Sequence, residues 1–461
     1  MKGLNSNLRM AAAAFAGAML LLVSSPIAGA QEKKVKDQGE YDIFNQTLKD
    51  ATNPAQQIKD LDTWTQKYPD SDYKDDRLYY YISAYSGAKQ PAKVLEVGSQ
   101  LMDRGLKNVF KDPKQGPQQV LTVLYQMSVN ILQIPNATAD QLAAGEKAAR
   151  ALGEYANEYF TAANKPANTS DADWAKTKND VTNLSKAVLM NLAMRPGTEA
   201  MNKYGQDKNP ENCKTAEAAF TKVLGQFPDS AAAAYNLGRA QVCLYKVQPD
   251  KISAGLYEVA RAVSMDPTLG GTAPDPKAIE KYLATLYTQY HGSDEEGLKQ
   301  LKEMAKASPL PPAGFKIKSE AEIITEREEE FKKTNPQLAL WMGIKKQLLD
   351  PAGEQYFASS LKDAQVPKLK GTVIEGKPAC RSKEILVAIS DAKNTEVALK
   401  LDSALTGKPE VGAEIQWEGV PSAFSKDPFL LTMDTEKAKI ENLKSSPCAA
   451  APTKKAAPRK K

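Results

Sequence analysis

The chain has 461 residues, long enough for two or three domains with cores of their own. Hydrophobic residues make up 42% and charged residues 25%, which is ordinary for globular proteins and excludes a wholly disordered chain. The formal net charge is +5, and the single histidine leaves almost every position without the commonest general base and metal ligand, which disfavours histidine-based catalysis.

Residues 1–30 have the pattern of a secretory signal peptide. Lys2 and Arg9 form a positive n-region, residues 11–23 an apolar segment, and residues 28–30 (Ala-Gly-Ala) the small-x-small pattern of a cleavage site. The apolar segment is short for a bilayer span, and no later stretch reaches about 18 uninterrupted apolar residues. An uncleaved anchor is the alternative. The pattern predicts a soluble exported protein, periplasmic or secreted.

The excess positive charge lies at the two ends of the chain. Without the two basic residues of 1–30 and the five of 454–461, 54 basic residues face 56 acidic ones. Nucleic-acid binding by a folded basic face is therefore disfavoured. Residues 445–461, rich in Ala, Pro and Lys, are expected to stay unfolded. They are either a solubilising tail or a weak contact to an anionic envelope polymer or membrane surface.

Four cysteines in an exported chain favour disulfides, and four allow three pairings. Cys213 and Cys243 are equidistant from a turn near residue 228, so an antiparallel helix pair would bring them to the same height. Cys380 and Cys448 then pair by elimination. Four free, buried cysteines are the alternative.

Amphipathic helices separated by Pro, Gly and Asp-Ser turns are predicted from about residue 40 to 365. Leu78, Tyr81, Ile82 and Tyr85 fall at i, i+3, i+4 and i+7, and the same period runs through residues 279–290. A helix is also expected at residues 181–194, in a part of the chain that lacks the repeat pattern described next. No convincing strand pattern precedes residue 369.

Internal repetition specifies the kind of helical array. Small, aromatic and proline residues recur at helical-hairpin spacing in residues 213–267, less clearly in 55–106 and 277–309. The markers are Ala216, Phe220, Pro228, Leu237, Gly238, Gly255 and Pro267. This pattern resembles the tetratricopeptide repeat (TPR), although the two prolines are 39 residues apart rather than about 34. Similar junctions occur in envelope-associated bacterial repeat proteins.

The resemblance implies a solenoid in which helix pairs stack, because a single pair cannot bury its apolar face. It also implies a concave face that binds an extended segment or a helix of a protein partner.

From residue 369 the hydrophobic period changes from 3.6 to 2, which predicts a small β domain over residues 366–444. Five strands are expected, at residues 369–375, 384–390, 395–401, 413–420 and 429–434. The first and fourth resemble strands of the small OB-like barrels of secreted bacterial proteins, and the size suits a five-stranded barrel. A small β-sandwich is the alternative.

OB-type barrels bind single-stranded nucleic acid or oligosaccharide through exposed aromatic side chains. Trp417, Phe424 and Phe429 are the candidate ligand face, with Lys377, Arg381 and Lys383 nearby. In so small a domain these aromatic residues can equally form the core.

Short matches to catalytic and metal motifs lack their partner residues. Gly371–Gly376–Lys377 is followed by Pro378, Ser359–Lys362 has no companion motif, and the acidic residues at 70–76 lack the glycine and glutamate of a calcium loop. His291 is expected to interact with a helix C-terminus. No catalytic residue, metal site or cofactor is predicted.

The sequence thus predicts a mostly α exported protein in four parts. These are a signal peptide (1–30), a TPR-like helical repeat domain (31–365), an antiparallel OB-like β-barrel domain (366–444) and a basic tail (445–461). The predicted function is a non-enzymatic scaffold that binds a protein partner in the cell envelope. The first alternative is an envelope module that binds carbohydrate or a polyanion through the barrel. A carboxylate-based enzyme is less favoured.

Cleavage after Ala30 gives a mature chain that begins at Gln31. Mass spectrometry of the exported protein should find this N-terminus, and an intact Met1 in exported material would contradict the prediction.

Overall fold

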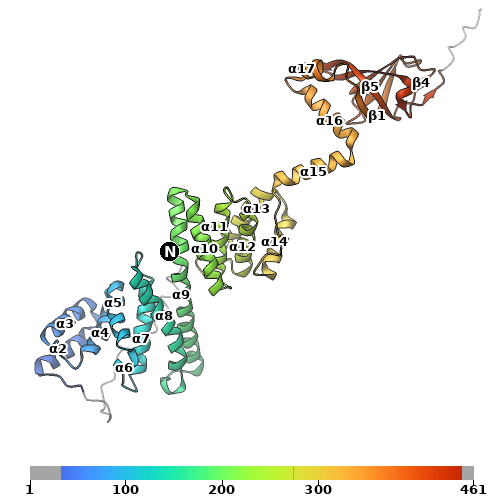
Figure 1. Ribbon diagram of the computed structural model, residues 1–461. Helices are drawn as coiled ribbons and strands as arrows, with labels where there is room; N and C mark the ends of the chain where they lie inside the picture. The colour runs from blue at the N-terminus through green and yellow to red at the C-terminus, as the bar shows by residue number, and fades with distance from the viewer. Residues whose placement is uncertain (1–32, 274, 449–461) are drawn as a thin grey trace, which may run out of the picture. The chain divides into compact units, whose positions relative to one another are not determined.

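The computed structural model describes residues 33–273 and 275–448 (Figure 1). It forms two compact units, the first ending at Ile317 and the second beginning at Lys318. The predicted signal peptide and residues 449–461 of the predicted tail lie outside the described residues. In the described part of the chain, no helix is long and apolar enough to cross a membrane.

The first unit consists of α-helices and two short 3-10 turns. They are α2 (Gln38–Lys49), η1 (Asp50–Thr52), α3 (Pro54–Lys67), α4 (Lys74–Gly87), α5 (Pro91–Asp103), α6 (Leu106–Val109), α7 (Gly116–Ile131), α8 (Ala139–Tyr159), η2 (Ala162–Asn164), α9 (Asp171–Asp207), α10 (Pro210–Gln226), α11 (Ala231–Leu244), α12 (Lys251–Met265), α13 (Pro276–His291) and α14 (Glu295–Ala307).

Most consecutive helices pack against one another as antiparallel hairpins that stack along the chain, whereas α14 packs mainly on α12 rather than on α13 (Figure 1). Local sequence defines where the helices begin. Asn209 caps α10 by accepting a hydrogen bond from the Glu211 N–H, and proline follows at the first helical position, where no N–H is needed. Ser230 caps α11 in the same way, accepting from the Ala233 N–H.

The helix predicted at residues 181–194 is part of the 37-residue helix α9, which continues through Pro196. The first part of α9 packs on α8 and the last part on α10. The side chain of Arg195 donates hydrogen bonds to the carbonyl oxygens of Ile131 and Ile134 at the end of α7. Gly197, directly after the proline, faces the ring of Phe220, where a Cβ would lie 2.7 Å from a ring carbon.

Five of the marker residues (Ala216, Phe220, Leu237, Gly238 and Gly255) lie at packing contacts between α9, α10, α11 and α12, whereas Pro228 and Pro267 are exposed in the turns. Ala216, Phe220 and Leu237 are buried together with Ala200 and Ala240 in one cluster. The Pro228 carbonyl accepts a hydrogen bond of 2.5 Å from the Arg261 guanidinium, which ties the turn before α11 to α12.

Helices α11 and α12 meet backbone to backbone at two glycines. A Cβ on Gly238 would lie 2.7 Å from the Gly255 carbonyl oxygen, and one on Gly255 would lie 3.0 Å from the Gly238 carbonyl oxygen. Both distances are shorter than a carbon–oxygen contact allows. Small residues are therefore required on both helices at this crossing.

The second unit combines helices with a closed five-stranded barrel. Its elements are α15 (Glu320–Thr334), α16 (Pro336–Leu349), α17 (Gly353–Tyr356), the π-helical turn η3 (Phe357–Leu361), β1 (Val366–Lys377), β2 (Glu384–Ala388), β3 (Val397–Leu401), β4 (Lys408–Pro409), β5 (Glu414–Lys426), β6 (Phe429–Thr435), η4 (Lys437–Lys439), β7 (Ile440–Glu441) and β8 (Ser445–Ser446). The five long strands, β1, β2, β3, β5 and β6, correspond one to one to the five strands that the sequence predicts, with different ends.

The barrel strands pair in the order β1-β2-β3-β6-β5, and β5 returns to β1 to close the ring. Four of the five pairings are antiparallel, as predicted, whereas β3 and β6 run parallel. The first part of β1 pairs with β5 and the last part with β2. A register shift between Val373 and Glu375 bends the strand between these two partners. This ring is OB-like.

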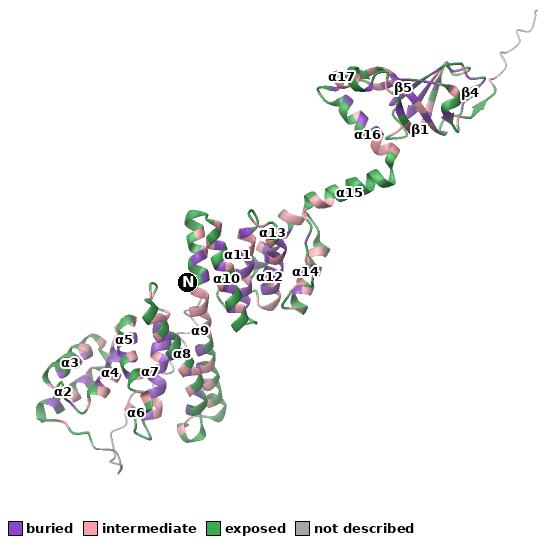
Figure 2. Ribbon diagram, viewed as in Figure 1, coloured by how far each residue is buried: buried purple, intermediate pink, exposed green. Residues whose placement is uncertain are grey.

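Helix α16 belongs to the same core as the barrel, so the second unit extends well before the predicted boundary at residue 366. Trp341 and Leu348 of α16 are fully buried with Val373, Leu399 and Trp417 of the barrel. Helix α15, in contrast, has no buried residue and is exposed apart from Glu322 and Ile323 in its first turn (Figure 2).

An ion pair with a buried carboxylate connects α16 to the barrel; the Lys345 side chain is 29% exposed. The Glu396 carboxylate accepts hydrogen bonds from Lys345, from the Ser390 hydroxyl, and from the Ile389 and Ser390 N–H groups at 2.8 and 2.6 Å. Only 3% of the Glu396 side chain is exposed. Burial alone would raise its pKa, but these donors outweigh it and hold the pKa of Glu396 below its usual value of 4.5.

The first residues of the predicted tail belong to the folded unit. Ser445 and Ser446 form β8, which pairs with Lys408 and Pro409 of β4. Cys448 then forms a disulfide with Cys380. Ordered structure thus continues beyond residue 444, the predicted end of the domain.

Gly238→Ala should destabilise the first unit by about 1–3 kcal/mol, because the added methyl group overpacks the α11–α12 crossing. Gly225→Ala is the matched control: its Cβ meets open space, and replacing a helical glycine by alanine there should be neutral or stabilising. Thermal unfolding followed by circular dichroism measures both. Equal effects of the two substitutions would contradict the close crossing.

Glu396→Gln should destabilise the second unit at pH 7 by about 3 kcal/mol, because Lys345 then has no carboxylate partner. Since the folded-state pKa of Glu396 is lowered, its stabilisation is complete above the unfolded value of about 4.3 and declines as the pH falls through the folded value. The difference between variant and wild type should therefore shrink below about pH 4.

Hydrogen exchange of amides in β2 and β3 reports on this unit alone. The exposed Glu410→Gln in the same unit is the control and should leave the exchange rates unchanged. A destabilisation by Glu396→Gln that persists unchanged at pH 3 would argue against the ion pair.

Candidate functional site

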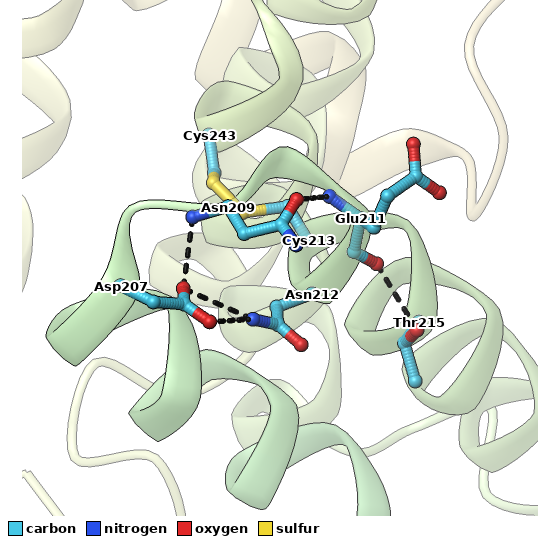
Figure 3. Close-up of a disulfide and its surroundings, with 7 residues drawn as sticks. All are labelled: Asp207, Asn209, Glu211, Asn212, Cys213, Thr215 and Cys243. Atoms are coloured by element: carbon cyan, nitrogen blue, oxygen red, sulfur yellow. Dashed lines mark hydrogen bonds between the residues drawn. A yellow bond between two sulfur atoms is a disulfide. The ribbon is translucent and has the colours of Figure 1, made fainter.

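The first predicted disulfide joins the beginning of α10 to the end of α11 (Figure 3). Cys213 and Cys243 have their Cα atoms 6.1 Å apart, and Cys213 is fully buried. The symmetry argument from the turn at residue 228 is confirmed. The bridge fixes the register of this helix pair at the end away from the turn.

A side-chain network shapes the α9–α10 turn beside this disulfide (Figure 3). The Asp207 carboxylate accepts hydrogen bonds from the Asn209 N–H and from the Asn212 amide at 2.8 to 3.1 Å. Lys208, between α9 and α10, has a φ of +55°. The polar side chains of this turn thus hydrogen-bond within the turn itself.

The second predicted pair, Cys380 and Cys448, is also bonded, with Cα atoms 5.9 Å apart. It joins the β1–β2 turn to the end of the described chain, and the described residues contain no free cysteine.

The candidate ligand face of the barrel needs correction. The Trp417 side chain is fully buried inside the barrel, so no ligand can reach it in the folded protein. Phe424 and Phe429 are half-buried and pack against the helical part of the same unit, with ring centroids 5.9 Å from Phe357 and 6.0 Å from Trp341. These aromatic residues form the core rather than a stacking platform.

The acidic residues 70–76 do not form a cation site. Asp76 pairs with Lys33 at 2.5 Å, Asp75 pairs with Arg104, and Asp72 accepts a hydrogen bond from the Lys34 N–H. His291 ends α13 and lies 3.3 Å from Asp294, as a helix-terminal residue would. Across residues 33–273 and 275–448 there is no group of three or more His, Cys, Asp or Glu residues able to hold a metal ion.

The surface best suited to binding lies on α11 and α13. We name it the tyrosine strip; its residues are Tyr235, Arg239, Val242 and Tyr245 of α11 and its C-terminal end, and Tyr282, Leu286 and Tyr290 of α13. On α11 the first three recur at i, i+4 and i+7, on the side of the helix opposite Leu237, which is buried. On α13 the three are four residues apart and therefore also share one face.

Aromatic pairs join the two helices along the tyrosine strip. Tyr235 meets Tyr282 edge to face with centroids 5.9 Å apart, and Tyr245 meets Tyr290 in the same way at 5.6 Å. Tyr245 is 38% exposed, whereas Tyr235, Tyr282 and Tyr290 are half-buried. The rings are thus held in place while part of each remains accessible.

The charge of the tyrosine strip comes from Arg239. Its guanidinium lies 5.6 Å from the centroid of the Tyr235 ring, an arrangement that allows cation–π attraction. The side chain is exposed and has no ion-pair partner among the residues that the structure describes. Burial raises the pKa of Tyr282, so its hydroxyl is neutral at physiological pH. Chemically, the tyrosine strip offers aromatic contacts, phenol hydroxyl groups and one uncompensated positive charge.

The sequence analysis did not single out the tyrosine strip. Tyr282 and Tyr290 follow the period that predicts α13, but periodicity does not tell a buried tyrosine from one at the edge of a groove. In α11, Tyr235, Arg239 and Val242 lie opposite the marker Leu237, but the marker Gly238 is one turn before Val242 on the same side of the helix, so the pattern alone does not separate the tyrosine strip from the packing face.

No protein-family model matches the chain, and no curated protein is significantly similar to it in sequence. The inferences below therefore depend on the residues and geometry described above.

Proposed function

We propose that this protein is an exported, non-enzymatic scaffold of the tetratricopeptide type, and that it binds a segment of a protein partner along the tyrosine strip. The observation that carries the proposal is the edge-to-face pairing of partly exposed tyrosines across α11 and α13, beside an arginine that has no acidic partner among the described residues. Tyr, Trp and Arg are the residues most enriched at the energetic centres of protein interfaces. Tyrosines that are already immobilised by packing lose little conformational entropy on binding.

The positions of the repeat markers support the tetratricopeptide assignment. Gly238 and Gly255 lie where α11 and α12 cross, and Phe220 fills the space beside Gly197. In such arrays the first helices of successive hairpins line the inner face. Since α11 and α13 are the first helices of their hairpins, the tyrosine strip is where a solenoid would hold its partner.

The chemistry of the tyrosine strip defines the partner segment. Aromatic edges and Val242 favour apolar side chains, and the unpaired Arg239 favours a carboxylate beside them. We therefore expect an extended or helical segment that carries an acidic residue next to apolar ones. Two disulfides in the described chain are compatible with export, and the partner would then be an envelope protein.

Tyr235→Ala with Arg239→Ala should abolish partner capture, with an affinity loss of about 30-fold or more if these residues form the centre of the interface. The measurement is quantitative co-purification from an envelope extract with the mature chain as bait. Proteins that the wild type retains should be lost from the double variant, and the circular dichroism spectrum of the variant should be unchanged.

The matched control is Tyr204→Ala with Lys208→Ala, which removes another cation–π pair of the first unit, between the half-buried Tyr204 near the end of α9 and the exposed Lys208 that follows it. This control should retain the same proteins as the wild type. Loss of capture with both double variants, or with neither, would contradict a specific role for the tyrosine strip.

A further inference from the structure

The exposed apolar side chains of the second unit are concentrated on two consecutive helices. Ile324 and Phe331 lie on α15, and Met342 and Leu349 lie on α16. Each of these four side chains is between 36% and 50% exposed. In the described part of this unit, Val411 is the other large apolar side chain with comparable exposure. Apolar residues scattered singly over a surface are ordinary, whereas a group of them indicates a surface that another molecule covers.

The four side chains form two stripes of equal length. We name them the α15 stripe (Ile324 and Phe331) and the α16 stripe (Met342 and Leu349). In each stripe the two residues are seven positions apart, which is about two helical turns, so they share one face of their helix. The α16 stripe lies outside the face that packs on the barrel, where Trp341 is fully buried. One stripe can therefore lie along the other.

Helix α15 lacks the tertiary contacts that normally stabilise a helix. It has 15 residues, and none of them is buried (Figure 2). A helix of this length is marginal in water by itself, because most of the stability of a protein helix comes from packing of its apolar face. A capping box between Ser319 and Glu322 stabilises only the first turn. The α15 stripe is the face on which such packing can occur.

The α15 stripe cannot cover the α16 stripe of its own chain. Asn335 is the one residue between Thr334, where α15 ends, and Pro336, where α16 begins. Two helices need about two to five residues between them to lie antiparallel and side by side. Pro336 also disfavours a helical conformation at Asn335, whose φ and ψ are −131° and 58°. If α15 covers an α16 stripe, that stripe therefore belongs to a second copy of the chain.

The net charges of the two helices are complementary. Helix α15 has six glutamates and three basic residues, whereas α16 has two lysines and no acidic residue. Of these lysines, Lys345 pairs with Glu396, and Lys346 is exposed between the two residues of the α16 stripe. The first acidic residue after α16 is Asp350, whose carboxylate accepts a hydrogen bond of 3.1 Å from the Ala352 N–H. An acidic helix with an apolar stripe thus matches a basic one.

We propose that this chain forms a two-fold symmetric dimer, in which α15 of each copy lies antiparallel on α16 of the other. Phe331 then contacts Met342 of the second copy, and Ile324 contacts Leu349 of the second copy. Because the spacing in both stripes is the same, both contacts form in one register. The dimer is isologous, so the same pair of contacts forms twice. This role does not depend on the partner that we propose for the tyrosine strip.

Charge favours the antiparallel orientation. It places Glu328, on one side of the α15 stripe, next to Lys346 of the second copy. Both side chains are exposed, and neither forms an ion pair with the described residues. Arg327, on the other side of the α15 stripe, then faces Lys345 of the second copy, whose charge Glu396 already compensates. A parallel orientation would instead place Arg327 beside Lys346.

The test measures the molecular mass of the mature chain, residues 31–461, by sedimentation equilibrium over a range of concentrations. The wild type should pass from monomer to dimer as the concentration rises. Ile324→Gln with Phe331→Gln should weaken the dimer at least about tenfold, because apolar side chains are lost from both symmetric contacts.

Met342→Gln with Leu349→Gln should weaken the dimer to a similar degree. The matched control is Leu310→Gln with Val411→Gln, which removes two exposed apolar side chains outside α15 and α16. This control should leave the dissociation constant unchanged.

A mixture of the α15 variant and the α16 variant tests which helix meets which. In the mixed dimer, one contact joins two altered helices and the other joins two unaltered ones. In each variant alone, both contacts have one altered member, so every apolar pair is lost. The mixture should therefore dimerise more tightly than either variant alone. An α16 variant that dimerises like the wild type would show instead that α15 pairs with α15, and would contradict the proposal.

Charge reversal tests the orientation. Glu328→Lys alone and Lys346→Glu alone should each weaken the dimer several-fold, and the two together should restore it, because the ion pair forms again with its charges exchanged. Glu329→Lys is the control, since Glu329 is five residues after Ile324 and lies on the far side of α15 from the stripe. Failure of the combined variant to recover would exclude the antiparallel pairing.

Hydrogen exchange gives a second readout. Amides of α15, which has no buried residue, should become protected only at concentrations at which the dimer forms. Amides of β2 and β3 should stay protected in every variant, which shows that the barrel is intact. A wild type that remains monomeric at all concentrations would overturn the proposal, as would a dimer that neither double variant weakens.

Discussion

The first unit depends on the close approach of neighbouring helices, because an isolated helix hairpin leaves an apolar face in water. Gly238 and Gly255 allow α11 and α12 to touch backbone to backbone, and Gly197 makes room for the Phe220 ring. The tyrosine strip borders this crossing, since Val242 follows Gly238 by one turn and its Cγ2 atom would lie 2.8 Å from a Cβ on Gly255. Most of its residues pack against a buried cluster, whereas Arg239 and Tyr245 remain exposed. The same glycines that allow the core to close thus position the surface that we propose binds a partner.

The stability of the second unit depends on a different constraint, the small size of its core. A five-stranded barrel has a small core, and here α16 enlarges it with Trp341 and Leu348. Phe424 and Phe429, which an OB-like barrel could offer to a ligand, pack instead against this helical part. Lys345 and Glu396 add an ion pair at the same contact, where loss of Lys345 would leave the buried Glu396 carboxylate without its cation.

Local patterns in the sequence predicted most of the elements, since helical and strand periods report which side of each element is buried. They also gave the Cys213–Cys243 pair, which follows from the symmetry of one hairpin. What local patterns could not report is which distant segment covers a buried side. Trp417 alternates like any strand residue, and nothing nearby indicates that α16 joins its core. The helix predicted at residues 181–194 likewise stops short of Pro196, whereas α9 continues through this proline and packs on α8 and α10. β8 is two residues long and leaves no periodic signal.

The continuity of α9 has a consequence for how the first unit unfolds in part. In a stacked array each hairpin contacts mainly its neighbours, so a boundary between melted and intact hairpins can form at any junction. With 37 residues, α9 is about 55 Å long and contributes Val188 to one buried cluster and Ala200 to another. Melting that stopped at this junction would strip the packing from half of a single continuous helix. A boundary between melted and intact hairpins is therefore least favourable at α9. The hairpins on its two sides should melt together, as one cooperative pair.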